Sequence, residues 1–133
     1  MELTDIGSMP VRDTDVLVIG GGPAGAAMGY WTAELGHSVT IVERKHFPRD
    51  KTCGDGLTPR AVKQLGDMGL GEPLKQFHRY EGLRATAHGK ELELQWPTHP
   101  LYPRHGYVVR RRELDAMVAF NAEKSGATLL QGH

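Results

Sequence analysis

A glycine-rich turn near the N-terminus has the composition and spacing of a phosphate-binding site. Gly20, Gly22 and Gly25 give the pattern G-x-G-x-x-G, with Pro23 and Ala24 in the same turn. In such a turn the first glycine permits a tight bend, the second lets backbone approach a diphosphate, and the third allows close packing of helix on strand. The N–H groups at the start of the following helix would then bind the phosphates. The pattern therefore predicts a dinucleotide site, and the absence of a following Gly-Lys-Ser/Thr excludes a P-loop.

An acidic residue stands where such a site needs one. Glu43 lies 18 residues after Gly25 (43 − 25), at the end of a second apolar segment. A carboxylate at that place accepts hydrogen bonds from ribose hydroxyls and disfavours a ribose 2′-phosphate. Arg44 follows directly and is counted among the cofactor-binding candidates. The turn and the acid do not distinguish FAD from NAD, because both cofactors present the same ADP half.

The elements around this turn predict a βαβ unit. Residues 16–19 (VLVI) are a short apolar run typical of a strand buried on both faces of a parallel sheet. Residues 24–35 are rich in alanine and end at Gly36, as a capped helix does. Residues 38–42 (SVTIV) are β-branched and predict a second strand. The predicted fold class is α/β, a Rossmann-like domain with a parallel sheet.

The rest of the chain continues this domain. A loop is expected over residues 46–57, followed by a helix from a Thr58 cap to residue 67 or 68. The remaining expected elements are a β-hairpin (83–87 and 91–95), a strand (107–109), an amphipathic helix (111–124) and a strand (127–130). Residues 1–12 are expected to form a flexible leader, and residues 13–133 the N-terminal part of a cofactor-binding domain whose sheet and hairpin layer are incomplete.

Composition excludes several classes of protein. The chain has 16 basic and 16 acidic residues and a net charge of +0, which argues against a nucleic-acid-binding protein. Its single cysteine, Cys53, forms no internal disulfide, and seven scattered histidines indicate no metal site. The charged N-terminal residues do not form a secretory signal, so a soluble, cytoplasmic protein is expected.

Three longer segments resemble a known flavoprotein family. Residues 15–25 (DVLVIGGGPAG) with 42–44 (VER) resemble the fingerprint of the class that includes p-hydroxybenzoate hydroxylase. Residues 48–61 (PRDKTCGDGLTPRA) are similar to a loop of the geranylgeranyl reductase family, and residues 107–115 (YVVRRRELD) resemble its Y-x-V-x-R-x-x-(L/F)-D segment. The resemblance implies FAD as cofactor and the reduction of isoprenoid double bonds, in geranylgeranyl or menaquinone-type prenyl chains.

The resemblance also implies roles for particular residues. It places Ala24 and the glycines of the turn on the FAD diphosphate and Glu43 on the ribose. It places Cys53, Gly54 and Gly56 beside the flavin, where residues without a Cβ let the backbone approach a flat ring. Arg111 is implied to contact the phosphate–ribitol portion through its planar fork of donors. No catalytic residue is assigned.

Other readings remain beside this one. The parent protein could be an aromatic hydroxylase or halogenase-type monooxygenase, or the chain a truncated nucleotide-binding fragment without catalysis. A dehydrogenase that uses only NAD has no need for the loop around Cys53. The chain alone is expected to bind FAD weakly and to be inactive. A prenyl substrate would bring the complete enzyme into peripheral contact with a membrane.

Overall fold

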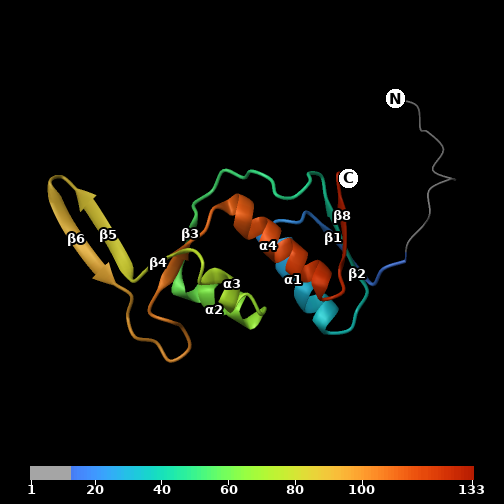
Figure 1. Ribbon diagram of the computed structural model, residues 1–133, viewed down its shortest axis with the longest axis horizontal. Coiled ribbons are helices and arrows are strands. Elements are labelled where there is room, and N and C mark those ends of the chain that lie inside the picture. Colours follow the sequence, from blue (N-terminus) through green and yellow to red (C-terminus); the bar gives the residue numbers. More distant parts are fainter. Residues whose placement is uncertain (1–12) are drawn as a thin grey trace.

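A three-stranded parallel sheet lies at one end of the body of the computed structural model (Figure 1). The structure describes residues 13–133, and the expected leader, residues 1–12, lies outside them. The strands are β1 (Val16–Ile19), β2 (Val39–Glu43) and β8 (Thr128–Gln131), in the order β1-β2-β8. All pairs are parallel, so the carboxyl ends of the three strands meet at one edge. The expected parallel α/β fold is confirmed.

Two helices pack together beside this sheet (Figure 1). They are α1 (Pro23–Glu34) and α4 (Arg111–Lys124). Their close approach depends on Gly29 of α1, where an added Cβ would lie 2.4 Å from Ile41 Cδ1 of the sheet and 3.8 Å from Ala122 Cβ of α4. Small residues at this crossing therefore bring α1, α4 and β2 into one core.

One face of β1 is more exposed than the sequence predicts. The expectation of a strand buried on both faces is wrong for β1, because Leu17 is 57% exposed and Ile19 is 78% exposed. β1 is an edge strand, and its side chains alternate between half-buried and exposed. Ile41 of the central strand, by contrast, is fully buried.

A second, antiparallel sheet packs beside the helices. Its strands follow the order β3-β7-β4, and α2 and α3 lie next to it. The bounds are β3 (Gly56–Leu57), α2 (Pro59–Asp67), α3 (Gly71–Leu74), β4 (His78–Tyr80) and β7 (Gly106–Val108). The cap of α2 is confirmed, since the Thr58 hydroxyl accepts from Ala61 N at 3.5 Å. The short β3 lies within the predicted loop, and α3 and β4 were not predicted.

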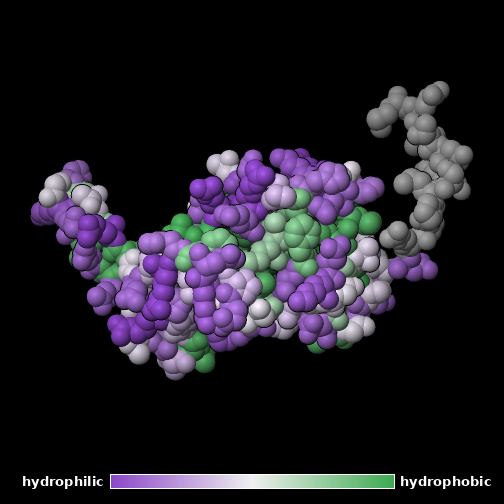
Figure 2. All heavy atoms as spheres, viewed as in Figure 1, coloured by the Kyte–Doolittle hydropathy of each residue, from purple (hydrophilic) through white to green (hydrophobic). Residues whose placement is uncertain are grey.

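The predicted hairpin protrudes from the body of the molecule (Figures 1 and 2). It consists of β5 (Gly82–Ala87) and β6 (Lys90–Gln95). His88 and Gly89 connect them with φ values of 49° and 71°, as a two-residue hairpin turn of mirror-image type requires. Within residues 13–133, no helix combines the length and the apolar character needed to cross a membrane.

The crossing at Gly29 generates a stability prediction. Gly29→Ala should lower the free energy of unfolding by about 1–3 kcal/mol, because the added methyl group would lie 2.4 Å from Ile41 Cδ1 and the fully buried Ile41 side chain would have to shift. Urea unfolding measures the change. The control is Gly66→Ala, in the exposed part of α2, where nothing lies within 4 Å of the added Cβ. It should be neutral or stabilising by up to about 1 kcal/mol. Equal stability of both variants would contradict the prediction.

Candidate functional site

The glycine turn connects β1 to α1 as a tight bend. Gly20 has φ +103° and donates from its N–H to Val42 O at 2.8 Å, which continues the sheet by one bond. A Cβ on Gly25 would lie 1.9 Å from Gly20 O, so no other residue fits where the helix passes the turn. These contacts give Gly20 and Gly25 the two structural tasks that the spacing predicts.

The beginning of α1 has backbone donors free to bind a ligand. Gly22 is the N-cap and Pro23 the first helical residue, and no side chain caps this end. The N–H groups of Ala24 and Gly25 therefore have no side-chain partner from a cap. On the open side of Gly22, an added Cβ would meet only Arg49 Nη2, at 3.6 Å. A helix end of this kind suits a phosphate group.

Glu43 points toward this turn from the end of β2. Its Oε2 accepts from Gly21 N at 2.9 Å and its Oε1 from Lys45 N at 3.1 Å, and the residue is only 6% exposed. Burial opposes the charged form, but the two backbone donors together with Arg49 outweigh it and hold the pKa of Glu43 below its ordinary value. Glu43 is therefore an ionised acceptor beside the turn, as the ribose-binding prediction requires.

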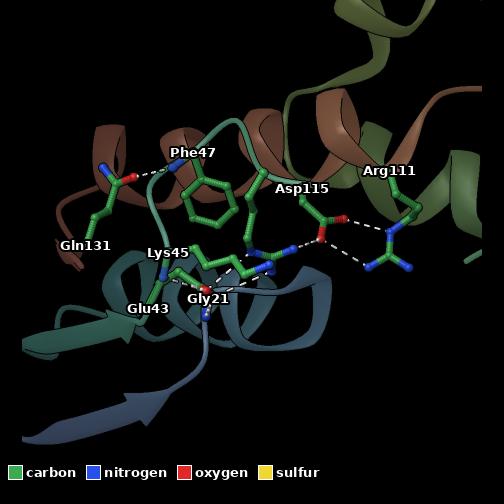
Figure 3. Close-up of polar contacts among 8 residues, drawn as sticks. Gly21, Glu43, Lys45, Phe47, Arg111, Asp115 and Gln131 are labelled. Atoms are coloured by element: carbon green, nitrogen blue, oxygen red, sulfur yellow. Dashed lines mark hydrogen bonds and ion pairs between the residues drawn. The ribbon is translucent and has the colours of Figure 1, made fainter. Parts of the chain in front are cut away.

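Arg49 and Asp115 connect Glu43 to the start of α4. Figure 3 shows Glu43, Asp115 and Arg111 along this connection. Arg49 lies 3.3 Å from Glu43 (Nε to Oε1) and 2.9 Å from Asp115 (Nη1 to Oδ2). Asp115 is fully buried and also accepts from Arg111, at 2.7 Å on Oδ1 and 3.1 Å on Oδ2. The four side chains form a row of alternating charge, negative and positive in turn, with no net charge.

The second group of predicted residues lies around a depression of about 420 Å³, on the loop before β3 and at the start of α4. Cys53 and Arg111 line it, together with Asp55, whereas Gly54 and Gly56 are exposed nearby without lining it. The Asp55 carboxylate accepts from Arg111 N at 3.0 Å and so holds the loop against the start of α4.

Arg111 is held in its charged form. Hydrogen bonds to Asp115, and to a lesser degree the neighbouring Cys53 thiol, raise the pKa of Arg111 above its ordinary value. Arg44, by contrast, is exposed and has no polar partner in the part of the chain that the structure describes. In this same part, no group of three His, Cys, Asp or Glu residues could hold a metal ion.

The residues present fit the ADP half of FAD. Uncapped N–H groups at the start of α1 suit a diphosphate, the open side of Gly22 leaves space for it, and Glu43 offers a buried, ionised carboxylate nearby. The contacts of these residues with FAD stay predictions.

Two residues of the site were missed by the sequence reasoning. Arg49 and Asp115 stand in the segments 48–61 and 107–115 that carry the family resemblance, but the sequence alone assigns no role to either. The spacing of Arg111 and Asp115, four residues apart on one helix, is a signal that could have predicted their ion pair. No sequence signal predicts that Arg49, 66 residues from Asp115, contacts it.

Comparisons with known proteins support FAD as the cofactor. Residues 13–133 match a family described as FAD binding domain. A menaquinone reductase of Mycobacterium tuberculosis is 47% identical over 125 residues, which are 93% of this chain and 30% of that protein. Digeranylgeranylglycerophospholipid reductase 2 of Methanopyrus kandleri is 33% identical over 117 residues, 85% of this chain and 26% of that protein. The chain thus spans less than a third of these relatives.

A solved structure has the same fold. The structure of a myxobacterial chondrochloren halogenase, an FAD-dependent enzyme, superposes with a TM-score of 0.81 at 30% identity. The match covers 90% of this chain and 28% of the halogenase chain.

The buried carboxylate of Asp115 generates a prediction. Asp115→Asn should lower the free energy of unfolding by about 3 kcal/mol or more, because two guanidinium groups lose their shared counter-charge in a buried place. Urea unfolding measures it. The control is Asp67→Asn, which removes an exposed ion pair with Lys63 and should change stability by less than about 1 kcal/mol. A loss no larger for Asp115→Asn than for the control would contradict the prediction.

Proposed function

We propose that this chain, which belongs to the FAD binding domain family, is the FAD-binding part of an oxidoreductase that reduces prenyl double bonds. The observation that carries the cofactor part of this proposal is the Glu43 carboxylate bound to Gly21 N beside the uncapped start of α1. The menaquinone reductase, at 47% identity, supports a prenylated quinone as the substrate class. The archaeal lipid reductase supports the wider class of isoprenoid double bonds.

The chain's own residues would bind and orient the cofactor. The N–H groups at the start of α1 would hold the diphosphate, and Glu43 would accept from the ribose hydroxyls. The exposed backbone at Gly54 and Gly56 leaves room for a flat ring system, and Arg111 offers charged donors beside it. FAD, when bound, supplies hydride transfer. Because prenyl chains are lipids, we also expect the complete enzyme to contact a membrane peripherally.

A halogenase or monooxygenase is the second candidate. The superposition with the chondrochloren halogenase supports it, since the fold of this part serves both chemistries. The higher identity to the menaquinone reductase, 47% against 30%, favours the reductase.

The cofactor part of the proposal is tested by FAD titration of this chain, followed by flavin fluorescence. FAD should bind, and Glu43→Gln should weaken binding by about tenfold, because the amide replaces a charged acceptor of the ribose hydroxyls by a neutral one. The control is Glu34→Gln, near the exposed C-terminal end of α1, which should bind like the wild type. Equal affinity of all three proteins would remove Glu43 from the site.

The substrate part is tested on the protein that contains this chain. With FAD and dithionite, it should convert a menaquinone into a product heavier by two hydrogen atoms in the prenyl chain, as measured by mass spectrometry. A quinone with a fully saturated side chain is the matched control: dithionite reduces the ring of both quinones, but the side chain of the control should gain no hydrogen. Halogenation or hydroxylation of an aromatic substrate, with no prenyl reduction, would favour the second candidate.

A further inference from the structure

We propose that Arg49 is a binding residue for the cofactor diphosphate, and that it gives up its contacts with Glu43 when the cofactor binds. This inference rests on the proposed function and adds a residue to that site. It starts from the place of Arg49 between the two groups of predicted residues. The loop after β2 brings the Arg49 side chain, which is only 10% exposed, to the turn between β1 and α1.

The guanidinium lies beside the uncapped end of α1. Its Nη2 lies 3.6 Å from the position that a Cβ on Gly22 would take, on the side where the backbone is open. The Phe47 ring lies on another side, with the Arg49 Cζ 5.0 Å from the ring centroid. A planar group with several donors next to free backbone N–H groups is suited to the oxygens of a diphosphate.

The Glu43 carboxylate is surrounded by protein donors, with three hydrogen bonds and a further ion-pair contact. Oε1 accepts from Lys45 N at 3.1 Å and lies 3.3 Å from Arg49 Nε, while Oε2 accepts from Gly21 N at 2.9 Å and from Arg49 Nη2 at 3.4 Å. A carboxylate has about four acceptor positions. The Arg49 guanidinium lies against both carboxylate oxygens, so two ribose hydroxyls can bind Glu43 together only if Arg49 moves away.

The contacts between Arg49 and Glu43 are the ones to be given up. They are longer than the two backbone contacts, and the buried Arg49 Nε makes no well-formed hydrogen bond. The contact with Asp115 is short, at 2.9 Å, and Asp115 is fixed by Arg111. Arg49 can thus remain bound to Asp115 while its other donors turn from the Glu43 carboxylate to the diphosphate.

The experiment compares ligands with and without the diphosphate on this chain. Dissociation constants for FAD, ADP and adenosine are measured by titration and by competition against FAD fluorescence. Arg49→Met should weaken FAD and ADP about ten- to a hundredfold, the effect of a lost hydrogen bond between charged groups. Adenosine should bind as well as to the wild type or better, because Glu43 is freed. The control is Arg84→Met on the protruding hairpin, where the side chain is 63% exposed.

Two outcomes would contradict the inference. Equal losses for ADP and adenosine would show that Arg49 only braces Glu43, and unchanged affinities would show that it has no part in binding. If Arg49→Met does not fold by circular dichroism, Arg49→Lys is compared in the same way and should also lose more ADP than adenosine affinity. If the wild-type chain binds ADP but not FAD, the proposed function is wrong, whereas the assignment of Arg49 to the diphosphate is still supported.

Discussion

The hydrogen bond between Gly21 N and the Glu43 carboxylate determines the geometry of the whole site. The parallel register aligns Ile19 with Val42, so the residues that follow the two strands emerge side by side. Gly20 N extends the pairing by one bond to Val42 O, and the next N–H along the chain meets Glu43. A Cβ on Gly21 would lie 3.2 Å from Glu43 Cβ and 3.2 Å from the Phe47 ring, so any larger residue in the middle of the turn would crowd this contact.

The buried carboxylates explain why the second half of the site has a fixed place. An isolated carboxylate in the interior costs several kcal/mol, and Asp115 has no exposure at all. Arg49 and Arg111 compensate its charge from two directions, one from the loop after β2 and one from its own helix. The same two arginines are thereby fixed beside the glycine turn and beside the depression near Cys53. The two arginines that compensate the buried charge of Asp115 are thus the same donors that are held in place for an anionic ligand.

Most of the fold followed from local patterns in the sequence, and the exceptions have physical causes. β1, the helix from Arg111 to Lys124 and the Thr58 cap were predicted at or near their observed residues, because apolar runs, periodicity and capping are local signals. The exposure of Ile19 was not predicted, since burial of a strand depends on which elements cover each face. The glycine turn and Glu43 could be placed from spacing alone. Arg49 could not, because its partners come from distant parts of the chain.

The packing of α4 on α1 links the core to the site. Arg49 bridges Glu43 on β2 and Asp115 on α4, and its reach is fixed by the length of one side chain. Helix α1 packs against both β2 and α4, and a Cβ added to its Gly29 would overlap Ile41 of β2 and come into van der Waals contact with Ala122 of α4. A larger residue at this crossing would force α1 and Ile41 apart, and Ile41 lies on β2, the strand that carries Glu43 at one end of the row of charges. The small residues of the core are therefore a condition for the row of charges, although none of them touches it.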